Sequence, residues 1–281
     1  MKAPIITKAS GLQVPFDVNK LRQSLHQSNA DQDTINEVLT EVQKQFYHGM
    51  STQKIYQIAF GLLKKKPKPF AAKYKLRRAI MELGPSGFPF ERYVAEILKH
   101  QGYSVKLGEI LKGHCVNHEI DIIAEKENQY LMIECKFHNQ ISYTCNVKIP
   151  LYIKARFQDL EQNEDNNSLP PKKMIQGWLI TNTKFSSDAI KYGLCAGLQL
   201  VGWDYPRNNS LSAQVDAAGL YPLTCLTSLT QNEKQLLLDK KIVLCRELQN
   251  NPSLISNTSM SESRKKHILD EVNFLSKTYQ P

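Results

Sequence analysis

Three residues near the middle of the chain have the types and spacing of a metal-assisted hydrolytic site. Asp121 lies in a short apolar segment, and Glu134 and Lys136 lie in the next one, after a polar turn at residues 126–129. If the two segments pair as a hairpin closed about that turn, Asp121 lies opposite Glu134. Side chains alternate along a strand, so Lys136 projects on the same face as Glu134.

Two carboxylates that face each other across a β-ladder repel, and a divalent cation between them removes the repulsion. Mg²⁺ prefers oxygen ligands and keeps several waters. The bound ion can activate a water and offset charge on a scissile phosphate, while a neighbouring lysine stabilises the transition state. The sequence therefore predicts Mg²⁺ on Asp121 and Glu134, with Lys136 assisting phosphodiester hydrolysis.

Glu91 is a candidate third ligand of this metal. It lies in a helix expected over 88–101, on a stripe with the core-facing residues Val94, Ala95 and Leu98. A carboxylate on such a stripe needs a partner, which a metal would supply. The alternative is a first-turn residue that the helix dipole stabilises. Both interpretations stay open.

The elements expected around these residues alternate strands with helices. They are helices at 88–101, 148–162 and 186–196, and strands at 103–108, 118–125, 130–137, 176–181 and 198–203. This order predicts an α/β fold, a mixed sheet with helices on both faces. The polar segment 163–173 is expected to be a surface loop. Lys148, Tyr152 and Arg156 flank an apolar helical stripe, and they either contact DNA phosphates or form a solvated surface.

With these elements, the segment resembles the PD-(D/E)XK nucleases, and within them the Mrr-like restriction endonucleases. The resemblance covers about residues 86–204 and rests on Glu91, Asp121 and Glu134-Cys135-Lys136 in this order of elements. It implies a restriction-endonuclease-like core in which Asp121 and Glu134 bind Mg²⁺ and Lys136 assists the attacking water. The same fold includes inactive binding modules, so catalysis is a separate expectation.

The first third of the chain is basic. Residues 1–87 carry 14 Lys and Arg against 6 Asp and Glu, and the whole protein has a net charge of +9. Two short strands are expected around Ser10-Gly11, followed by a helix after Asp17 and helices at about 31–47, 51–64 and 70–83. A basic surface of this kind attracts a nucleotide triphosphate or a DNA backbone, or is simply solvated.

Residues 5–83 resemble the ATP-cone, a small, mainly helical regulatory domain. The matching features are Thr7-Lys8, the turn at Gly11, Val14 to Asp17 before Lys20, Ser51-Thr52 at a helix start, Ala72, Tyr74 and Arg77. The resemblance implies binding of ATP or dATP, with Lys8, Lys20, Thr52 and Arg77 as contacts. Ala9 and Ser10 replace the basic and acidic residues usual after the first lysine, which removes one candidate phosphate contact. The sequence has no glycine-rich Walker loop.

Residues 205–281 are expected to form a helical C-terminal region, with a helical hairpin within 219–250. A cap that completes the nuclease core is favoured over a DNA-contacting hairpin. The predicted domains are therefore an ATP-cone at 1–84, a nuclease domain at 88–204 and a helical region at 205–281. The Gly- and Pro-containing loop at 84–87 separates the first two.

Composition indicates a cytoplasmic protein. Six scattered cysteines without a C-x-x-C pair indicate reduced thiols, and neither a signal peptide nor a membrane span is expected. The favoured function is an Mg²⁺-dependent, restriction-like DNA endonuclease regulated by ATP or dATP. The alternative is an ATP- or dATP-sensing DNA-binding regulator without catalysis. A third option, a homo-oligomer assembled by nucleotide binding, also stays open.

Overall fold

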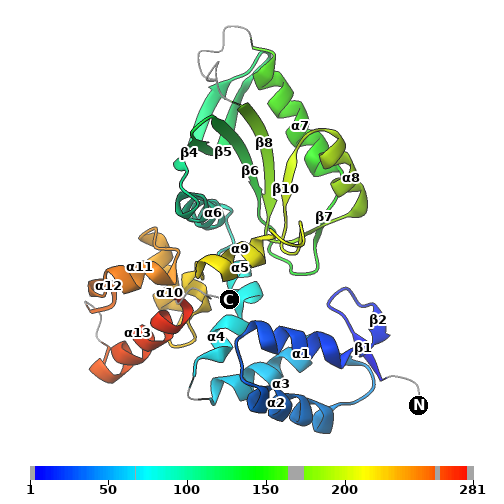
Figure 1. Cartoon of the computed structure of the whole chain (residues 1–281), viewed down its shortest axis with the longest axis vertical. Helices are drawn as coiled ribbons and strands as arrows, with labels where there is room; N and C mark the ends of the chain where they lie inside the picture. The colour runs from blue at the N-terminus through cyan, green and yellow to red at the C-terminus, as the bar shows by residue number, and fades with distance from the viewer. Residues whose placement is uncertain (1–3, 67, 164–173, 257–259, 277–281) are drawn as a thin grey trace. The chain divides into compact units, whose positions relative to one another are not determined.

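The computed structural model describes residues 4–66, 68–163, 174–256 and 260–276 (Figure 1). These residues form two compact units, which are described separately. Of the described residues, those within 4–79, 221–235 and 245–276 belong to the first unit, and those within Ile80–Leu220 and Leu236–Leu244 belong to the second. Within the described ranges, no helix has the length and apolar character that a membrane crossing requires.

The second unit is built on a five-stranded sheet of order β10-β8-β6-β5-β4. The strands are β4 (Ser104–Lys112), β5 (Asn117–Lys126), β6 (Gln129–Lys136), β8 (Met174–Thr181) and β10 (Gln199–Val201). β5 is antiparallel to both β4 and β6, whereas β8 is parallel to β6 and β10 is parallel to β8. The sheet is therefore mixed, as predicted, and β6 is its central strand.

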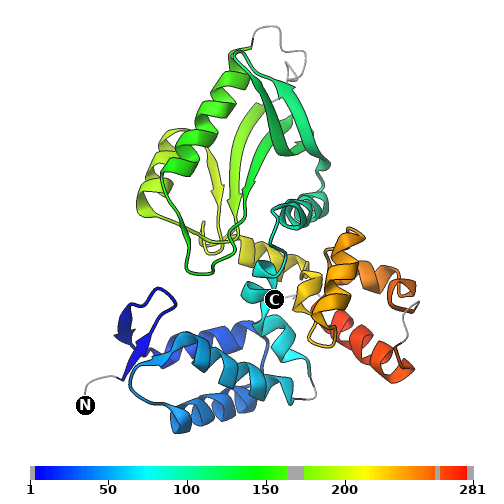
Figure 2. The ribbon, with the colours of Figure 1, turned by 180° about the vertical axis from the view of Figure 1, so that it is seen from behind.

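Helices cover both faces of this sheet (Figure 2). α6 (Phe88–His100) contacts β4, β5 and β6, while α7 (Lys148–Glu161) contacts β8 and α8 (Ser187–Cys195) contacts β10. Ile153 and Phe157 of α7 are buried in one core with Tyr130 of β6. On the other face, the ring of Phe90 in α6 lies 5.6 Å from that of Phe137. The predicted architecture, an α/β core with helices on both faces, is confirmed.

The first unit combines a small sheet with helices. β1 (Ile5–Thr7) pairs antiparallel with β2 (Gln13–Pro15) and parallel with β3 (Met50–Ser51). The helices that follow these strands are α1 (Val18–Gln27), α2 (Gln32–Gln45), α3 (Thr52–Lys64), α4 (Phe70–Tyr74) and α5 (Leu76–Met81). Asp17, Asp31 and Ser51 each accept a backbone N–H as the N-cap of α1, α2 and α3. The helix expected over 70–83 is divided at Lys75.

The C-terminal region is helical, as predicted. Its elements are α9 (Leu211–Ala218), the 3₁₀ turn η1 (Leu223–Cys225), α10 (Gln231–Asp239), α11 (Cys245–Asn250), α12 (Ser253–Ser256) and α13 (Glu262–Ser276). Most of it packs in the first unit, where the rings of Phe70 and Phe274 meet edge to face at 6.0 Å. The Thr224 hydroxyl there donates to the Ala79 carbonyl at 2.6 Å. The expected cap on the nuclease core is therefore wrong for residues 221–235 and 245–250.

Three two-residue strands were not predicted. They are β3 in the first unit and, in the second, the parallel pair β7 (Thr144–Cys145) and β9 (Lys184–Phe185). Two residues carry no detectable alternation, so only the folded chain reveals such strands. The surface loop predicted at 163–173 lies, from residue 164 onward, outside the described residues.

Candidate active site

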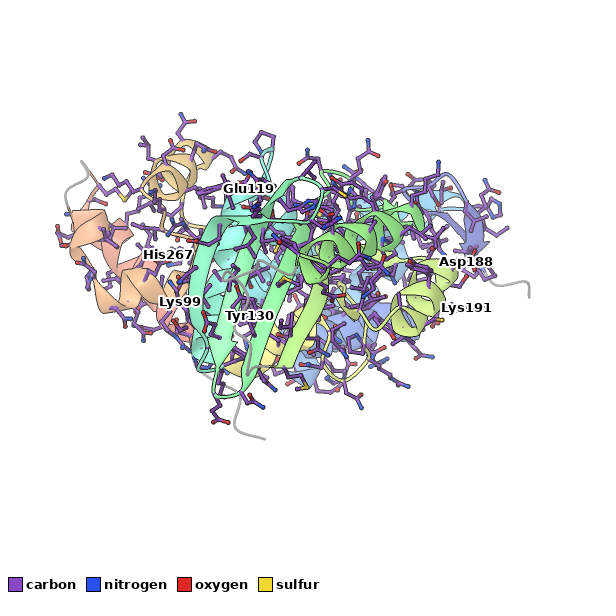
Figure 3. The ribbon with its side chains drawn as sticks, turned by 90° about the horizontal axis from the view of Figure 1, so that it is seen from above. Lys99, Glu119, Tyr130, Asp188, Lys191 and His267 are labelled. Carbon is purple, nitrogen blue, oxygen red and sulfur yellow. The ribbon has the colours of Figure 1, made fainter. Side chains whose placement is uncertain are left out.

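The β5–β6 hairpin has the register that the sequence predicts. Its pairs run from Lys126 with Gln129 to Ile122 with Ile133, and the next residues along the two strands are Asp121 and Glu134. The turn is tighter than expected, since only residues 127 and 128 are unpaired and Glu127 has a φ of 49°. Figure 3 labels Glu119 and Tyr130, which mark the open end and the turn end of this hairpin. The candidate site lies at the open end.

Asp121 is held by the backbone of the neighbouring strand. Its Oδ2 accepts the N–H of Cys135 at 2.7 Å. Burial raises the pKa of the Asp121 carboxyl above its usual range, and this effect outweighs the Cys135 N–H and the charges of Arg156 and Lys136, which lower it. The hydrogen bond fixes the orientation of this carboxylate beside β6.

Glu134 lies next to Asp121 and is paired with an arginine from α7. Arg156 Nη1 donates to Glu134 Oε2 at 2.6 Å, and each side chain is only 13% exposed. Burial and the charge of Asp121 raise the pKa of Glu134 to about 7, although Arg156 and Lys136 oppose the shift. Two carboxylates thus meet in a partly desolvated place where a cation lowers the energy of both.

Arg156 has a second contact at the site, because its Nη2 donates to the carbonyl oxygen of Glu119. Its guanidinium also lies 5.6 Å from the centre of the Tyr152 ring. The sequence predicted a flank position for Arg156, either contacting DNA phosphates or solvated, whereas in the structure Arg156 pairs with Glu134. The available signal was its position directly before the buried Phe157, which places it at the edge of the helix face that packs on the sheet.

Lys136 ends the central strand two residues beyond Glu134. The hydroxyl of Thr181, on β8, donates to the Lys136 carbonyl at 2.7 Å and fixes the backbone there. The ammonium charge lowers the pKa of both Asp121 and Glu134. His138 follows, stacked on the Tyr143 ring at 3.8 Å, and burial with the nearby Lys136 charge lowers its pKa to about 4. The imidazole is therefore neutral at neutral pH.

Glu91 approaches the site from α6. Burial, followed by the charges of Asp121 and Glu119, raises its pKa to about 7. Burial, followed by the charges of Asp121, Glu91 and Glu134, raises the pKa of the buried Cys135 thiol. Across the described ranges, no three histidine, cysteine, aspartate or glutamate side chains are grouped to hold a metal ion. Glu91 lies close enough to Asp121 for the two charges to interact, but its role as a third metal ligand stays a prediction.

The donor set at the hairpin end fits a hard divalent ion. Asp121 and Glu134 supply carboxylate oxygens, which Mg²⁺ prefers, and the ion ordinarily completes its shell with water. Both carboxyls have raised pKa values because burial disfavours their charged forms, and the charge of Asp121 raises the pKa of Glu134 further. A bound dication would reverse that penalty. Mg²⁺ on Asp121 and Glu134 therefore agrees with the chemistry of the residues present.

Two of the predicted nucleotide contacts lie at one edge of the small sheet. Thr7 of β1 pairs with Ser51 of β3, so Lys8 and Thr52 directly follow the paired ends of two parallel strands. Lys8 is exposed, and Thr52 is the first residue of α3. A helix N-terminus beside a lysine favours a phosphate group.

The other two predicted contacts lie on helices. Lys20 of α1 is exposed and lies 4.0 Å from Asp17. Arg77 lies on α5, next to Arg78, whose guanidinium covers the Tyr56 ring at 3.6 Å. The roles of Lys8, Lys20, Thr52 and Arg77 in nucleotide binding remain predictions.

Family models match almost the whole chain in three segments. Residues 4–82 match the ATP cone domain, residues 84–204 match a restriction endonuclease domain, and residues 221–276 match the AF1548-like C-terminal domain. The first two matches confirm the resemblances that the sequence suggested. The third match covers C-terminal helices for which the sequence suggested no family.

A curated protein of Archaeoglobus fulgidus, described as uncharacterized, is 37% identical over 155 residues, which are 55% of this chain and 83% of the relative. The crystal structure of AF1548, described as a protein of unknown function, matches with a TM-score of 0.54 and 32% identity, over 67% of this chain and 97% of that one. MspJI restriction endonuclease in complex with a 27-mer oligonucleotide matches at 10% identity and a TM-score of 0.34, over 73% of this chain and 40% of that one. That last similarity is too weak to carry an argument. The chain belongs to the AF1548-like family. In this chain, an ATP cone domain precedes a restriction endonuclease domain.

Proposed function

We propose that this protein is an Mg²⁺-dependent DNA endonuclease whose activity is regulated by ATP or dATP. One observation carries the proposal: Asp121 and Glu134 lie side by side at the open end of a hairpin in a restriction endonuclease domain, with Lys136 on the same strand. The nuclease domain is assigned to residues 88–204 and the nucleotide-binding domain to residues 1–84.

The residues of the hairpin end divide the chemistry among them. Asp121, oriented by the Cys135 N–H, and Glu134 would hold the ion. When bound, Mg²⁺ supplies the Lewis acid that activates a water and neutralises charge on the scissile phosphate. Lys136, fixed through its backbone by Thr181, directs its ammonium toward the charge that develops on the phosphate.

A cleavage assay with the full chain tests this proposal. Supercoiled, linear and single-stranded DNA are incubated with Mg²⁺ or Mn²⁺, each with and without ATP or dATP. Asp121→Asn and Lys136→Ala should each lose about 100-fold or more in rate, because each removes one group that stabilises the transition state. Circular dichroism checks that both variants are folded.

Two matched variants control for the loss of charge alone. Glu127→Gln removes a carboxylate at the turn end of the same hairpin, and Lys106→Ala removes an exposed lysine from β4. Both should cleave like the wild type. If the wild type leaves every DNA form intact, or if Asp121→Asn cleaves at the wild-type rate, the hydrolytic proposal is wrong.

Nucleotide binding is tested separately by calorimetry. Lys8→Ala should weaken ATP or dATP binding by about tenfold or more, the size of one charge-assisted phosphate contact. Lys44→Ala is the control, because Lys44 lies on α2 and pairs with Glu41 at 3.7 Å. Equal affinities for the wild type and Lys8→Ala would remove Lys8 from the proposed site.

One observation favours a second function, a nucleotide-sensing DNA-binding regulator without catalysis. Arg156 already pairs with Glu134, so this carboxyl has a cationic partner without a metal ion. Such a regulator would shift DNA in a gel, respond to dATP, and bind equally well in Mg²⁺ and in EDTA. An absence of cleavage together with that pattern would favour it over the endonuclease.

A further inference from the structure

We propose that Arg156 is a built-in counter-ion that competes with the divalent metal for Glu134, so that metal loading requires its guanidinium to move away. The inference rests on the proposed metal site and adds a residue that acts on it. Arg156, a cation of the chain itself, pairs with Glu134, a carboxylate suited to a metal.

The geometry of Arg156 is that of a two-point clamp. One guanidinium nitrogen donates to Glu134 Oε2 at 2.6 Å, and the other donates to the carbonyl oxygen of Glu119 on the neighbouring strand. Both partners of the ion pair are 13% exposed, so water competes little for either. The clamp thus joins α7 to both strands of the hairpin at its open end.

The helix that carries Arg156 is fixed in place. Ile153 and Phe157, on either side of it in sequence, are each 1% exposed in the core against the sheet. The backbone of α7 therefore holds its position, and only the side chain of Arg156 is free to swing. A long, flexible side chain on a fixed helix can change partners without unfolding the site.

A metal ion and the Arg156 guanidinium cannot both bind Glu134 strongly at the same time. A dication bound by Asp121 and Glu134 would lie within a few ångströms of a guanidinium hydrogen-bonded to the same carboxylate, and like charges at such distances repel strongly in a shielded site. The Tyr152 ring, 62% exposed, already lies 5.6 Å from the guanidinium and offers it a second resting place toward solvent. A guanidinium that the metal displaces from Glu134 can therefore move toward the Tyr152 ring.

Titration of the DNA-free full chain with Mn²⁺, followed by calorimetry or by the electron paramagnetic resonance signal of free Mn²⁺, tests the inference. Arg156→Gln removes the competing charge and should bind Mn²⁺ about tenfold more tightly than the wild type. Arg156→Lys keeps the charge but loses the two-point fork, so its affinity should lie between the two. Unfolding in EDTA gives a second readout, in which Arg156→Gln should melt earlier and gain more from Mg²⁺ than the wild type.

The matched control is Lys154→Gln, which removes a positive charge from the same helix. Lys154 pairs with Glu161 at 3.7 Å, and its loss should leave Mn²⁺ affinity unchanged. Glu134→Gln locates the bound ion, since it should abolish the tight site in every background. If Arg156→Gln and Arg156→Lys both bind Mn²⁺ as the wild type does, at a site that Glu134→Gln removes, the competition is wrong and the metal site stands. If no variant binds beyond the Glu134→Gln background, the metal site and the competition fail together.

Discussion

At the scale of single residues, burial controls the charge at the open end of the hairpin. The pKa values of Glu91 and Glu134 are both raised to about 7, in each case with burial as the largest cause and the charge of Asp121 as the next. An acidic site is thus kept partly protonated near neutral pH in the absence of metal. This has a direct consequence for the stability of the protein.

We expect the metal-free protein to lose stability as the pH rises from about 4.5 to 7. The folded pKa values of Glu91 and Glu134 exceed the ordinary value of 4.5, so the folded state holds more protons than the unfolded state in this window. Stability falls with pH wherever the native state binds the more protons, and Glu134 should contribute roughly 1 kcal/mol or less per pH unit. Urea unfolding in EDTA across this range measures the slope.

The control for this slope is Glu134→Gln, which cannot titrate and should flatten it. Mg²⁺ should also flatten it, because a metal binds the deprotonated carboxylates and stabilises the native state most at the upper end of the window. A wild type and a Glu134→Gln variant with the same slope would show that this carboxyl is not perturbed.

The pairing of acidic residues could be predicted from sequence, but the partner of Glu134 could not. Strand alternation and a tight turn determine the hairpin register, which places Asp121 beside Glu134. The direction of Arg156 depends on how α7 is rotated against the sheet, and that rotation is set by long-range packing of Ile153 and Phe157. A helical stripe in the sequence shows which face is apolar, not which strand its edge will meet.

At the scale of elements, α7 is positioned by a close approach to β8. Gly177 of β8 lies under the Phe157 ring, and a Cβ built on this glycine would come within 2.4 Å of a ring carbon and 3.0 Å of Leu198. The absence of a side chain at Gly177 therefore lets α7 pack closely enough for Arg156 to reach Glu134.

Gly177→Ala should destabilise the protein by about 1–3 kcal/mol, because a methyl group has no room beneath the Phe157 ring. Chemical denaturation followed by tryptophan fluorescence measures the loss. The matched control is Gly61→Ala in α3, where nothing lies within 4 Å of the added Cβ. That change should stabilise by about 0.5–1 kcal/mol, since alanine favours the helix. An unchanged free energy of unfolding in Gly177→Ala would mean that α7 packs less closely on β8 than it does in the structure.

The longer elements could be predicted and the shortest could not. Apolar alternation predicted the strands of the hairpin, and Asp17, the N-cap of α1, predicted the start of that helix. Two-residue strands, including β7 and β9, form only because distant segments meet. The division of the 70–83 helix at Lys75 was also not predicted. Lys75 Nζ there donates to the Thr224 carbonyl, 149 residues away in sequence, a contact that local pattern does not indicate.

At the scale of the whole molecule, the ATP cone domain shares its unit with the C-terminal helices. Lys73 of α4 lies over the rings of Tyr221 and Phe274, at 5.2 and 5.7 Å, and Phe70 meets Phe274 edge to face. Glu271, 1% exposed, accepts the backbone N–H groups of Thr227 and Ser228 at 2.8 and 3.1 Å. Sequence position suggested a separate tail because nothing local indicates which unit a distant helix joins.

Phe274→Ala should lower the stability of the first unit, which contains the ATP cone domain, although Phe274 belongs to the last helix. Loss of this half-buried ring should cost about 1–3 kcal/mol and lower the hydrogen-exchange protection of α4. Tyr47→Ala, which removes a 57% exposed ring in the same unit, should change stability by no more than about 0.5 kcal/mol. Unchanged protection of α4 in Phe274→Ala would contradict the shared unit.

The most direct test of the central claim is the position of a metal ion in a crystal of the full chain grown with Mn²⁺. Anomalous diffraction locates Mn²⁺ independently of any assay of activity. The account predicts one strong peak within coordination distance of carboxylate oxygens of both Asp121 and Glu134, about 2.0–2.3 Å away. A crystal in which Mn²⁺ binds elsewhere, or in which these two carboxylates stay without a peak at saturating Mn²⁺, would contradict it.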